Sequence, residues 1–259
     1  MFAHKEFGET TKEFSDRIRL TRDLGTDTKI AICGKLDPQA RGITSILIGK
    51  DTQYMDKYLQ SDKTYEFSIV LGISTGSDDI MGKITESKEL NMDCAVDAIR
   101  TFMHTYISNQ TVQKYHPISA KKIRLHPGKK QPLWYWTKLG LLSDDDLPSK
   151  SVIVYSLEEI GAPITTDFID YLSVVTDRLS LITNKKAFDI DHIVNSWTES
   201  TVKTLVMLQY RIKVSSGFYV RMIAKNIRDV LNIPVHIFGI NRINVQPTAP
   251  PHGEAFRLK

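Results

Sequence analysis

Two stretches of alternating residue character constrain the fold of this chain most. Residues 65–71 alternate Tyr, Phe, Ile and Leu with Glu, Ser and Val, and residues 208–214 alternate Leu, Tyr, Ile and Val with Gln, Arg and Lys. Because successive side chains of a strand point to opposite faces, this period of two predicts two strands, the first with one buried face. A further, β-branched strand is predicted over residues 152–157.

Helices are predicted between these strands from apolar spacing and capping residues. Thr10 and Glu13 fit a capping box, which predicts a first helix over about residues 10–22. Asp93 is expected to cap a second helix, and residues 168–182 place apolar side chains at helical spacing behind a Thr-Thr-Asp start. Strands and helices therefore alternate along the chain.

Composition sets the broad class. The 259 residues, 41% hydrophobic and 25% charged, suit an ordinary globular protein of one large or two small domains. No apolar run approaches the roughly 20 residues that span a bilayer, and the N-terminus lacks the apolar core of a signal peptide. We therefore expect a soluble monomer inside the cell, in the cytoplasm or the nucleus. The two cysteines are far apart and the seven histidines are scattered, so no metal is expected.

Positive charge is concentrated in one segment. The window between Asp97 and Asp144 holds eight of the 34 Lys and Arg residues and none of the 30 Asp and Glu residues. It ends in the aromatic run 134–136, and basic residues interleaved with aromatic ones suit RNA, whose phosphates meet the charge and whose bases meet the rings. The alternative is a solvated lysine-rich loop.

One carboxylate stands in a short turn bounded by glycine. Residues 34–42 read Gly-Lys-Leu-Asp-Pro-Gln-Ala-Arg-Gly and lead into an apolar run, residues 43–48. Asp37 is the candidate reactive group of this turn. The alternative is that Asp-Pro merely opens the turn, because Asp bonds its own backbone and Pro presets φ.

Four motifs in sequence order resemble those of the TruB-type pseudouridine synthases. Residues 36–42 are similar to the family's Leu-Asp-Pro-x-Ala-x-Gly turn, and residues 63–65 (Lys-Thr-Tyr) to its Lys-x-Tyr strand. Residues 117–122 (Pro-Ile-Ser-Ala-Lys-Lys) resemble its Pro-x-x-Ser-Ala-x-Lys segment, and residues 216–221 (Ser-Gly-Phe-Tyr-Val-Arg) its Gly-x-Tyr-Ile-Arg turn. The resemblance covers most of the chain and is closest to the eukaryotic branch.

The resemblance implies an α+β pseudouridine synthase fold, with a mixed, largely antiparallel central sheet flanked by helices and RNA-binding loops. It implies an isomerase that converts uridine to pseudouridine, at uridine-55 in the T loop of tRNA, without a cofactor. The implied catalytic residues are Asp37, which acts at the sugar–base junction, Arg221, which keeps it ionised, and Tyr65, which stacks on the base. The implied RNA-binding residues are Tyr219, Lys121, Lys122, Lys129, Lys225, Arg228 and Ile240.

The same resemblance suggests a domain plan and exposes two departures. We expect a catalytic domain over residues 1–249 with a helical insertion at about 162–204, a tail over 250–259 and no PUA domain. Ile32 stands where the family has His, and Gly76 where it has Asp. Two alternatives therefore stay open: a non-catalytic tRNA-binding or tRNA-folding protein with the same fold, or a pseudouridine synthase for another RNA.

Overall fold

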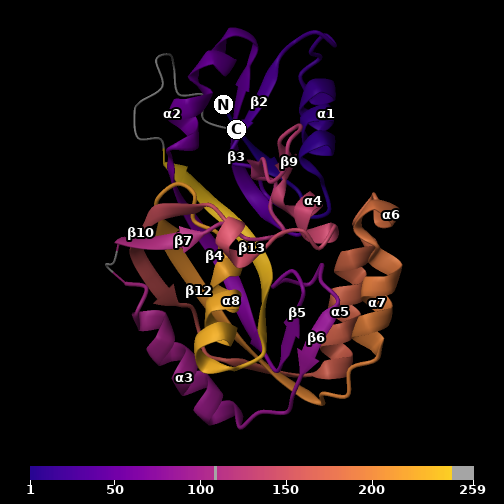
Figure 1. Cartoon of the computed structure of the whole chain (residues 1–259), viewed down its shortest axis with the longest axis vertical. Coiled ribbons are helices and arrows are strands. Elements are labelled where there is room, and N and C mark those ends of the chain that lie inside the picture. Colours follow the sequence, from indigo (N-terminus) through magenta and orange to yellow (C-terminus); the bar gives the residue numbers. More distant parts are fainter. Residues whose placement is uncertain (108–109, 247–259) are drawn as a thin grey trace.

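The structure, a computed structural model, describes residues 1–107 and 110–246. Within them, nine strands form one sheet with the order β1-β3-β13-β4-β12-β10-β7, while β2 pairs with β3 and β11 with β12 (Figure 1). All these pairs are antiparallel except β13 with β3. The strands are β1 Phe2–Lys5, β2 Ile30–Cys33, β3 Arg41–Ile48, β4 Asp62–Leu71, β7 Gln110–Lys114, β10 Ser149–Glu159, β11 Ile164–Asp167, β12 Thr204–Val214 and β13 Val235–Gln246. The predicted α+β class with a mixed, largely antiparallel sheet is confirmed.

Short hairpins and helices surround this sheet. The hairpins are β5 Ile73–Thr75 with β6 Ile84–Ser87, and β8 Lys122–Ile123 with β9 Gln131–Pro132. The helices are α1 Thr11–Thr21, α2 Met55–Leu59, α3 Met92–His104, α4 Leu133–Lys138, α5 Phe168–Ser180, α6 Lys185–Phe188, α7 Ile190–Thr198 and α8 Arg221–Leu231, with 3₁₀ turns η1 Gly49–Tyr54 and η2 Asp144–Asp146.

The two strands predicted from alternation are neighbours at the centre of the sheet. β12 pairs with β4 from Val206 opposite Leu71 to Val214 opposite Lys63, and β13 pairs with the other edge of β4. β4 is therefore the middle strand of the order β1-β3-β13-β4-β12-β10-β7 and is hydrogen-bonded on both edges. The two sequence segments that meet here lie more than 130 residues apart.

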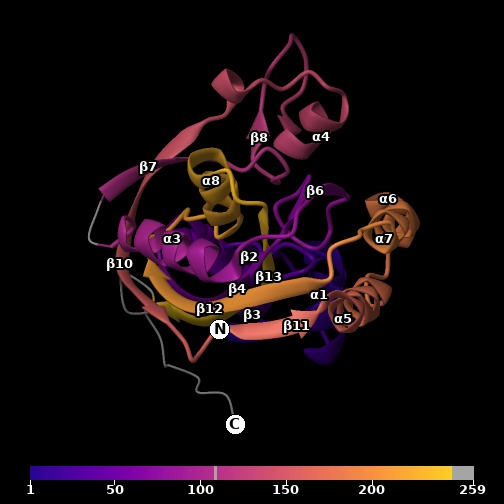
Figure 2. The same cartoon turned by 90° about the horizontal axis from the view of Figure 1, so that it is seen from below.

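One face of the sheet is covered by α3 and α8 (Figure 2). Their apolar stripes pack on β4, β10, β12 and β13, and the turn between β2 and β3 closes the same core. Such burial of aliphatic side chains is the main favourable term in folding, at about 25 cal/mol per Å² of apolar surface.

One end of the other face is covered by α5 and α7, which lie in the segment expected to be an insertion at about 162–204. α5 and α7 pack on Val70, Leu205 and Phe238 of the sheet, so the second half of β4 is buried on both faces. The prediction of a single buried face for this strand is therefore wrong beyond Phe67, because the helix predicted over 168–182 packs there. That helix itself is confirmed as α5, whereas β11, which precedes it, was not predicted.

The N-terminal elements form a smaller layer at the top of Figure 1. The capping box of α1 is confirmed, since the Thr10 side chain accepts from Glu13 N–H and the Glu13 side chain accepts from Thr10 N–H. Phe14 and Ile18 of this helix pack on Ile32 and Ile46 of β2 and β3. The second helix begins two residues earlier than predicted, because Asn91 rather than Asp93 accepts from Cys94 N–H at its N-cap.

No helix in the described part of the chain is long and apolar enough to cross a membrane. The expected tail at 250–259, and residues 247–249 of the expected catalytic domain, lie outside the described residues.

Arg242 generates the first prediction, because its buried guanidinium joins β13 to β3. Its Nε donates to Ile43 O at 2.6 Å, and its Nη2 donates to Gly34 O at 2.8 Å and to Thr44 Oγ1 at 2.6 Å. Arg242→Leu leaves these acceptors without their charged donor, so we expect a loss of about 3 kcal/mol in the free energy of unfolding, measured with urea.

The matched control is Arg41→Leu, at the exposed position that pairs with Asn241 across the same two strands. It should change the free energy of unfolding by less than about 0.5 kcal/mol. Equal losses in the two variants would contradict a special role for the Arg242 hydrogen bonds.

Candidate active site

The turn between β2 and β3 presents Asp37 to solvent. Ala40 N–H donates to Asp37 O at 3.0 Å, which closes the turn, and the Asp37 side chain keeps 40% of its surface exposed. Gly42 has φ +122°, and a Cβ there would lie 2.3 Å from Arg242 O, so only glycine fits where the turn enters β3. The backbone thus fixes one accessible carboxylate at the end of a buried strand.

Buried hydrogen-bond donors bind the backbone carbonyls of this turn. Lys5 Nζ donates to Ala40 O at 2.8 Å and to Pro38 O at 3.4 Å, and Gly8 N–H donates to Pro38 O at 2.9 Å. Lys5 is 1% exposed, and burial lowers the pKa of its amine to about 8. Together with Arg242 at Gly34, these donors limit how far the Asp37 backbone can move.

Arg221 is the partner of Asp37. It is the first residue of α8, and its side chain is 5% exposed. Its Nη2 lies 2.7 Å from Asp37 Oδ2 and donates to Ile118 O at 2.9 Å, while its Nη1 donates to Ser77 O at 3.2 Å. The guanidinium therefore meets three separate chain segments, and the ion pair expected from the sequence is present.

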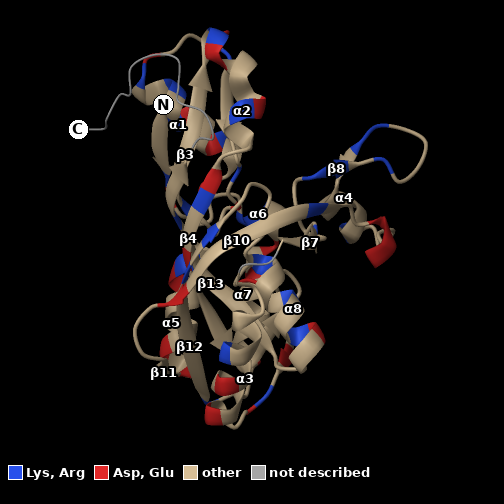
Figure 3. Cartoon of the chain, turned by 90° about the vertical axis from the view of Figure 1, so that its left-hand side faces the viewer, with Lys and Arg blue, Asp and Glu red and all other residues tan. Residues whose placement is uncertain are grey.

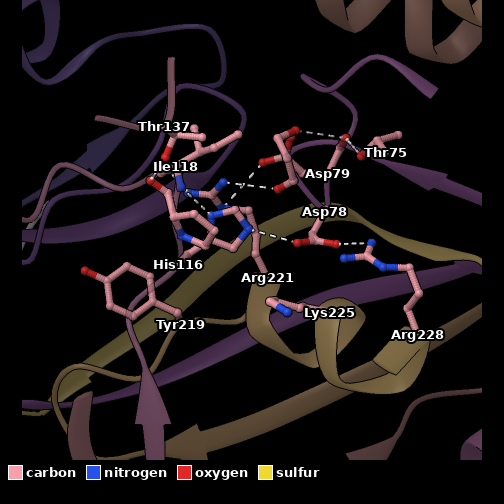
Figure 4. Close-up of polar contacts among 12 residues, drawn as sticks. Thr75, Asp78, Asp79, His116, Ile118, Thr137, Tyr219, Arg221, Lys225 and Arg228 are labelled. Carbon is pink, nitrogen blue, oxygen red and sulfur yellow. Dashed lines mark hydrogen bonds and ion pairs between the residues drawn. The ribbon is translucent and has the colours of Figure 1, made fainter. Parts of the chain in front are cut away.

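Asp79 is a second carboxylate on the same guanidinium. Its Oδ2 lies 3.5 Å from Arg221 Nε (Figure 4). Its Oδ1 accepts from Ser77 Oγ at 2.5 Å and from Met81 N–H at 2.9 Å. Burial raises the pKa of Asp79 to about 6 and the charge of Asp37 adds to the rise, whereas Arg221 opposes it. Asp37 and Asp79 thus share one cation but differ in exposure, 40% against 3%.

A second buried network lies beside the first. Asp78 Oδ2 is 3.0 Å from His116 Nε2, and Asp78 Oδ1 is 2.5 Å from Arg228 Nη1 (Figure 4). Because Ile118 N–H donates to His116 Nδ1 at 3.0 Å, the ring proton sits on Nε2 and is donated to Asp78. Burial lowers the pKa of His116 to about 4, so the ring is neutral at pH 7. Burial would raise the pKa of Asp78, but His116 and Arg228 outweigh it and bring that pKa below its usual range.

The two networks include residues that the sequence did not single out as a site. His116, Asp78 and Asp79 were not predicted as site residues. The adjoining motif at residues 117–122 was the one available signal for His116, since Ile118 of that motif contacts both the ring and Arg221.

Tyr65 and Ile240 lie under the Asp37 turn. Tyr65 is 8% exposed and Ile240 is 5% exposed, and both belong to the hydrophobic core that includes Leu36 and Ala40. Tyr219 is half-buried, and its ring centroid lies 5.2 Å from that of Tyr115. Burial raises the pKa of the Tyr219 phenol, so it is protonated at neutral pH. None of these three side chains is charged, so they contribute apolar and aromatic surface near the turn rather than ion pairs.

Three of the predicted RNA-binding lysines lie on a projecting arm, residues 118–141, which contains β8, β9 and α4. Lys121, Lys122 and Lys129 are exposed, and Figure 3 shows Lys and Arg along the arm where it stands away from the sheet. Lys121 Nζ lies 4.9 Å from the centroid of the Tyr115 ring. The basic window of the sequence is therefore an exposed surface beside the candidate site.

Lys225 and Arg228, predicted as RNA-binding residues, do not form a solvent-facing basic stripe with Arg221 on α8. Arg221 is buried, and Arg228 is paired with Asp78. Lys225 Nζ lies 2.7 Å from Asp229 Oδ2, with its side chain 19% exposed. For Arg221 and Arg228 the reason is tertiary, because the hairpin turn brings Asp79 and Asp78 against this face of the helix.

The two departures from the family pattern have plain structural roles. Ile32 is 8% exposed and packs with α1, and Gly76 N–H donates to Lys83 O at 3.0 Å within the β5–β6 hairpin.

Across the described part of the chain, no three His, Cys, Asp or Glu side chains are grouped so that they could hold a metal ion.

Comparisons with known proteins point to one family. The TruB family pseudouridylate synthase (N terminal domain) matches residues 22–158, just over half of the chain. The tRNA pseudouridine synthase B of Syntrophus aciditrophicus (strain SB) is 31% identical over 164 residues, which cover 62% of this chain and 48% of that protein. The protein of the same name from Caldanaerobacter subterraneus subsp. tengcongensis is 26% identical over 239 residues, which cover 92% of this chain and 65% of the relative.

The chain therefore spans about half to two thirds of the length of these curated relatives. Among solved structures, a chain in the crystal structure of a Cbf5-Nop10-Gar1 complex is similar with a TM-score of 0.50 and 16% identity, covering 93% of this chain and 47% of that chain. That likeness concerns the fold alone.

Asp79 generates a prediction on pH. Because the folded protein binds the Asp79 proton more tightly than the unfolded chain, the group stabilises the fold at low pH, and this contribution is lost as the pH rises through about 6. Relative to Asp79→Asn, the wild type should lose about 2 kcal/mol of unfolding free energy between pH 4.5 and 7.5, measured with urea.

The neighbouring Asp78→Asn variant is the control. The pKa of Asp78 in the wild type is lowered in the folded protein, so the contribution of Asp78 to the free energy of unfolding is lost only as the pH falls below the usual aspartate range. The Asp78→Asn difference should stay level between pH 4.5 and 7.5, and an equal drift in both variants would contradict the assignment to Asp79.

Proposed function

Because this chain belongs to the TruB family of pseudouridylate synthases, we propose that it isomerises uridine to pseudouridine at uridine-55 in the T loop of tRNA. One observation carries the proposal: the accessible Asp37 carboxylate lies 2.7 Å from the buried guanidinium of Arg221. The two curated relatives described above bear the name tRNA pseudouridine synthase B, which supports tRNA as the substrate class.

The chemistry needs one anionic group beside the sugar–base junction. Isomerisation breaks the bond from ribose C1′ to N1 of the base and forms a bond from C1′ to C5. C5 gives up its proton and N1 takes one up, so no atom is gained overall and no electron is exchanged with a cofactor. In this proposal Asp37 supplies the anion. Arg221 balances the charge of Asp37 and holds the carboxylate in one orientation through the 2.7 Å ion pair.

The target base must leave the stack of the T loop to reach Asp37. Unstacking costs a few kcal/mol, and an aromatic side chain in the enzyme offsets part of that cost. We assign this role to Tyr65. Ile240 belongs to the same hydrophobic cluster, and Tyr219 is a second aromatic side chain at the site. The raised pKa of Tyr219 keeps it a neutral hydrogen-bond donor.

We assign phosphate contacts mainly to the arm, through Lys121, Lys122 and Lys129. These lysines are exposed and carry no ion pair within the described residues, so they are available to a polyanion. Lys225 and Arg228 are assigned a smaller share, because carboxylates of the protein already meet them.

A specific observation keeps a second function in view. Ile32, which packs on α1, replaces the histidine of the family motif, and an alkyl side chain cannot do the chemistry of an imidazole. A non-catalytic tRNA-binding or tRNA-folding protein would tolerate this replacement. The experiment below separates the two functions.

The test is carbodiimide-based mapping of pseudouridine in unmodified tRNA incubated with the protein. The wild type should form pseudouridine at position 55, and Asp37→Asn should form none while its Kd for tRNA stays within about twofold, because one neutral carboxamide does not weaken phosphate contacts. Asp27→Asn, at an exposed loop position, is the matched control and should retain full activity.

The outcomes are distinct. Binding without product in the wild type would support the tRNA-binding function, and product at another site or in another RNA would change the substrate. Turnover by Asp37→Asn would remove Asp37 from the mechanism.

Salt dependence tests the arm. Each phosphate contact contributes roughly 0.7–0.9 to the slope of log Kd against log salt, so replacing Lys121, Lys122 and Lys129 together by Gln should lower the slope by about 2 to 3 and weaken binding. A triple Gln variant of Lys12, Lys29 and Lys88, exposed lysines on other parts of the surface, is the control. If both triple variants bind with the wild-type slope, the arm lysines are merely solvated.

A further inference from the structure

The inserted segment runs from β11 to α7, and its helices α5, α6 and α7 lie along the right-hand side of Figure 1. Residues 162–204 contain six acidic and four basic residues. A surface that grips phosphates is normally basic, so this balance is against an RNA-binding role. The contacts of the segment with the rest of the protein point to a different role.

The hairpin that carries Asp79 is packed on the insertion. Ile73 and Ile80 are fully buried, and they belong to the hydrophobic cluster of α5 and α7 rather than to the cluster beneath α3 and α8. The apolar face of the Asp79 turn therefore has the insertion as its packing partner.

Three polar contacts from α7 and its start hold the strand that follows Asp79. Trp197 Nε1 donates to Gly82 O at 3.2 Å, Ile84 N–H donates to Ser196 Oγ at 2.9 Å, and Lys83 Nζ lies 3.1 Å from Asp189 Oδ2. These contacts hold three consecutive residues of the hairpin, 82–84. Trp197 is fully buried, so its indole N–H has no competing water.

Gly82 connects these contacts to Asp79. Gly82 N–H donates to Asp79 O at 3.2 Å, and a Cβ on Gly82 would lie 2.6 Å from Ser77 N. Ser77 in turn donates to Asp79 Oδ1 and gives its carbonyl to Arg221. A shift of Gly82 is therefore passed directly to two groups that hold the guanidinium.

A second contact runs from α5 to β13. Tyr171 Oη lies 2.6 Å from His236 Nε2, and His236 Nδ1 donates to Ile73 O at 2.9 Å at the start of the hairpin. The next residue, Ile237, donates its N–H to Asp78 O at 2.9 Å. Both strands of the hairpin are thus connected to the insertion.

The far end of the insertion contacts the segment that fastens the Asp37 turn. Thr183 Oγ1 donates to Glu13, the guanidinium of Arg178 lies 5.5 Å from the Phe7 ring centroid, and Leu181 O packs directly on Gly8. Gly8 is the residue that donates to Pro38 O, one residue after Asp37. The insertion therefore touches the supports of both carboxylates that flank Arg221.

We propose that the insertion is a brace that fixes the hairpin of Asp79 relative to the Asp37 turn, with Trp197 as its main positioning residue. The brace sets the orientation of Arg221 and, through it, of Asp37. Its effect on turnover rests on the proposed function, whereas its effect on the geometry of the site does not.

The first test is single-turnover conversion of unmodified tRNA by Trp197→Phe, which keeps an aromatic side chain but removes the five-membered ring of the buried indole and with it the N–H donor to Gly82. Misplacement of a reacting group lowers the rate constant steeply, so we expect a fall of roughly tenfold to a hundredfold with the Kd for tRNA unchanged within about twofold. Ile169→Ala, on the exposed face of α5 at 78% exposure, is the control and should keep the wild-type rate.

The second test does not require activity. The ¹H–¹⁵N signal of Arg221 Nε–H, which faces Asp79, should shift in Trp197→Phe, and amide hydrogen exchange of residues 77–84 should speed up, with neither change in Ile169→Ala. Ser196→Ala, which removes only the acceptor for Ile84 N–H, should show the same changes to a smaller degree and serves if Trp197→Phe fails to fold.

The outcomes separate the two proposals. If the wild type forms no pseudouridine but the Arg221 signal shifts in Trp197→Phe, the proposed function fails and the brace stands. An active wild type with an unshifted Arg221 signal and an unchanged rate in Trp197→Phe and Ser196→Ala would overturn the brace.

Discussion

The structure depends on one buried guanidinium. Arg221 has 5% of its side chain exposed, and a charge so far from water is tolerated only if its donors are satisfied and its charge is balanced. Asp37, Asp79 and the carbonyls of Ser77 and Ile118 meet that need. Removing one partner of such a group typically costs 3–5 kcal/mol, because an uncompensated buried charge remains. The requirement therefore brings three turns and the start of α8 to one point.

The two carboxylates on this guanidinium are not equivalent. Asp79 is buried and receives two further hydrogen bonds, which makes it a fixed part of the protein. Asp37 keeps 40% of its side chain open, so it is the one that a substrate can reach. The second network of Asp78, His116 and Arg228 adds a neutral histidine and another ion pair beside it. One arginine can thus orient an exposed carboxylate while its other, buried partner holds the arginine in place.

Several parts of the fold hold the residues around Arg221 in place. Lys5 and Arg242 bind the carbonyls of the Asp37 turn from β1 and β13, and the β5–β6 hairpin packs between the sheet and the insertion. Rigid secondary elements position a site more closely than loops do. Ile32 fits the same pattern, since its side chain contributes to packing where the family motif has a polar ring.

The sequence by itself determined the central strands β4 and β12, the capped helix α1, helix α5 and the turn that carries Asp37, because periodicity, caps and turn chemistry act over a few neighbouring residues. The resemblance of four short motifs also indicated that Asp37 and Arg221 would meet. Only the tertiary structure decided the rest. His116 and Asp78 pair across 38 residues, Arg228 and Asp78 across 150, and Trp197 and Gly82 across 115. Lys225 pairs with Asp229 of the same helix. For Arg221 and Arg228, nothing in the local pattern of α8 distinguishes a solvated side chain from a paired one, since the helix has the same spacing in both cases. The carboxylates that decide between them lie on a hairpin that packing alone brings within reach.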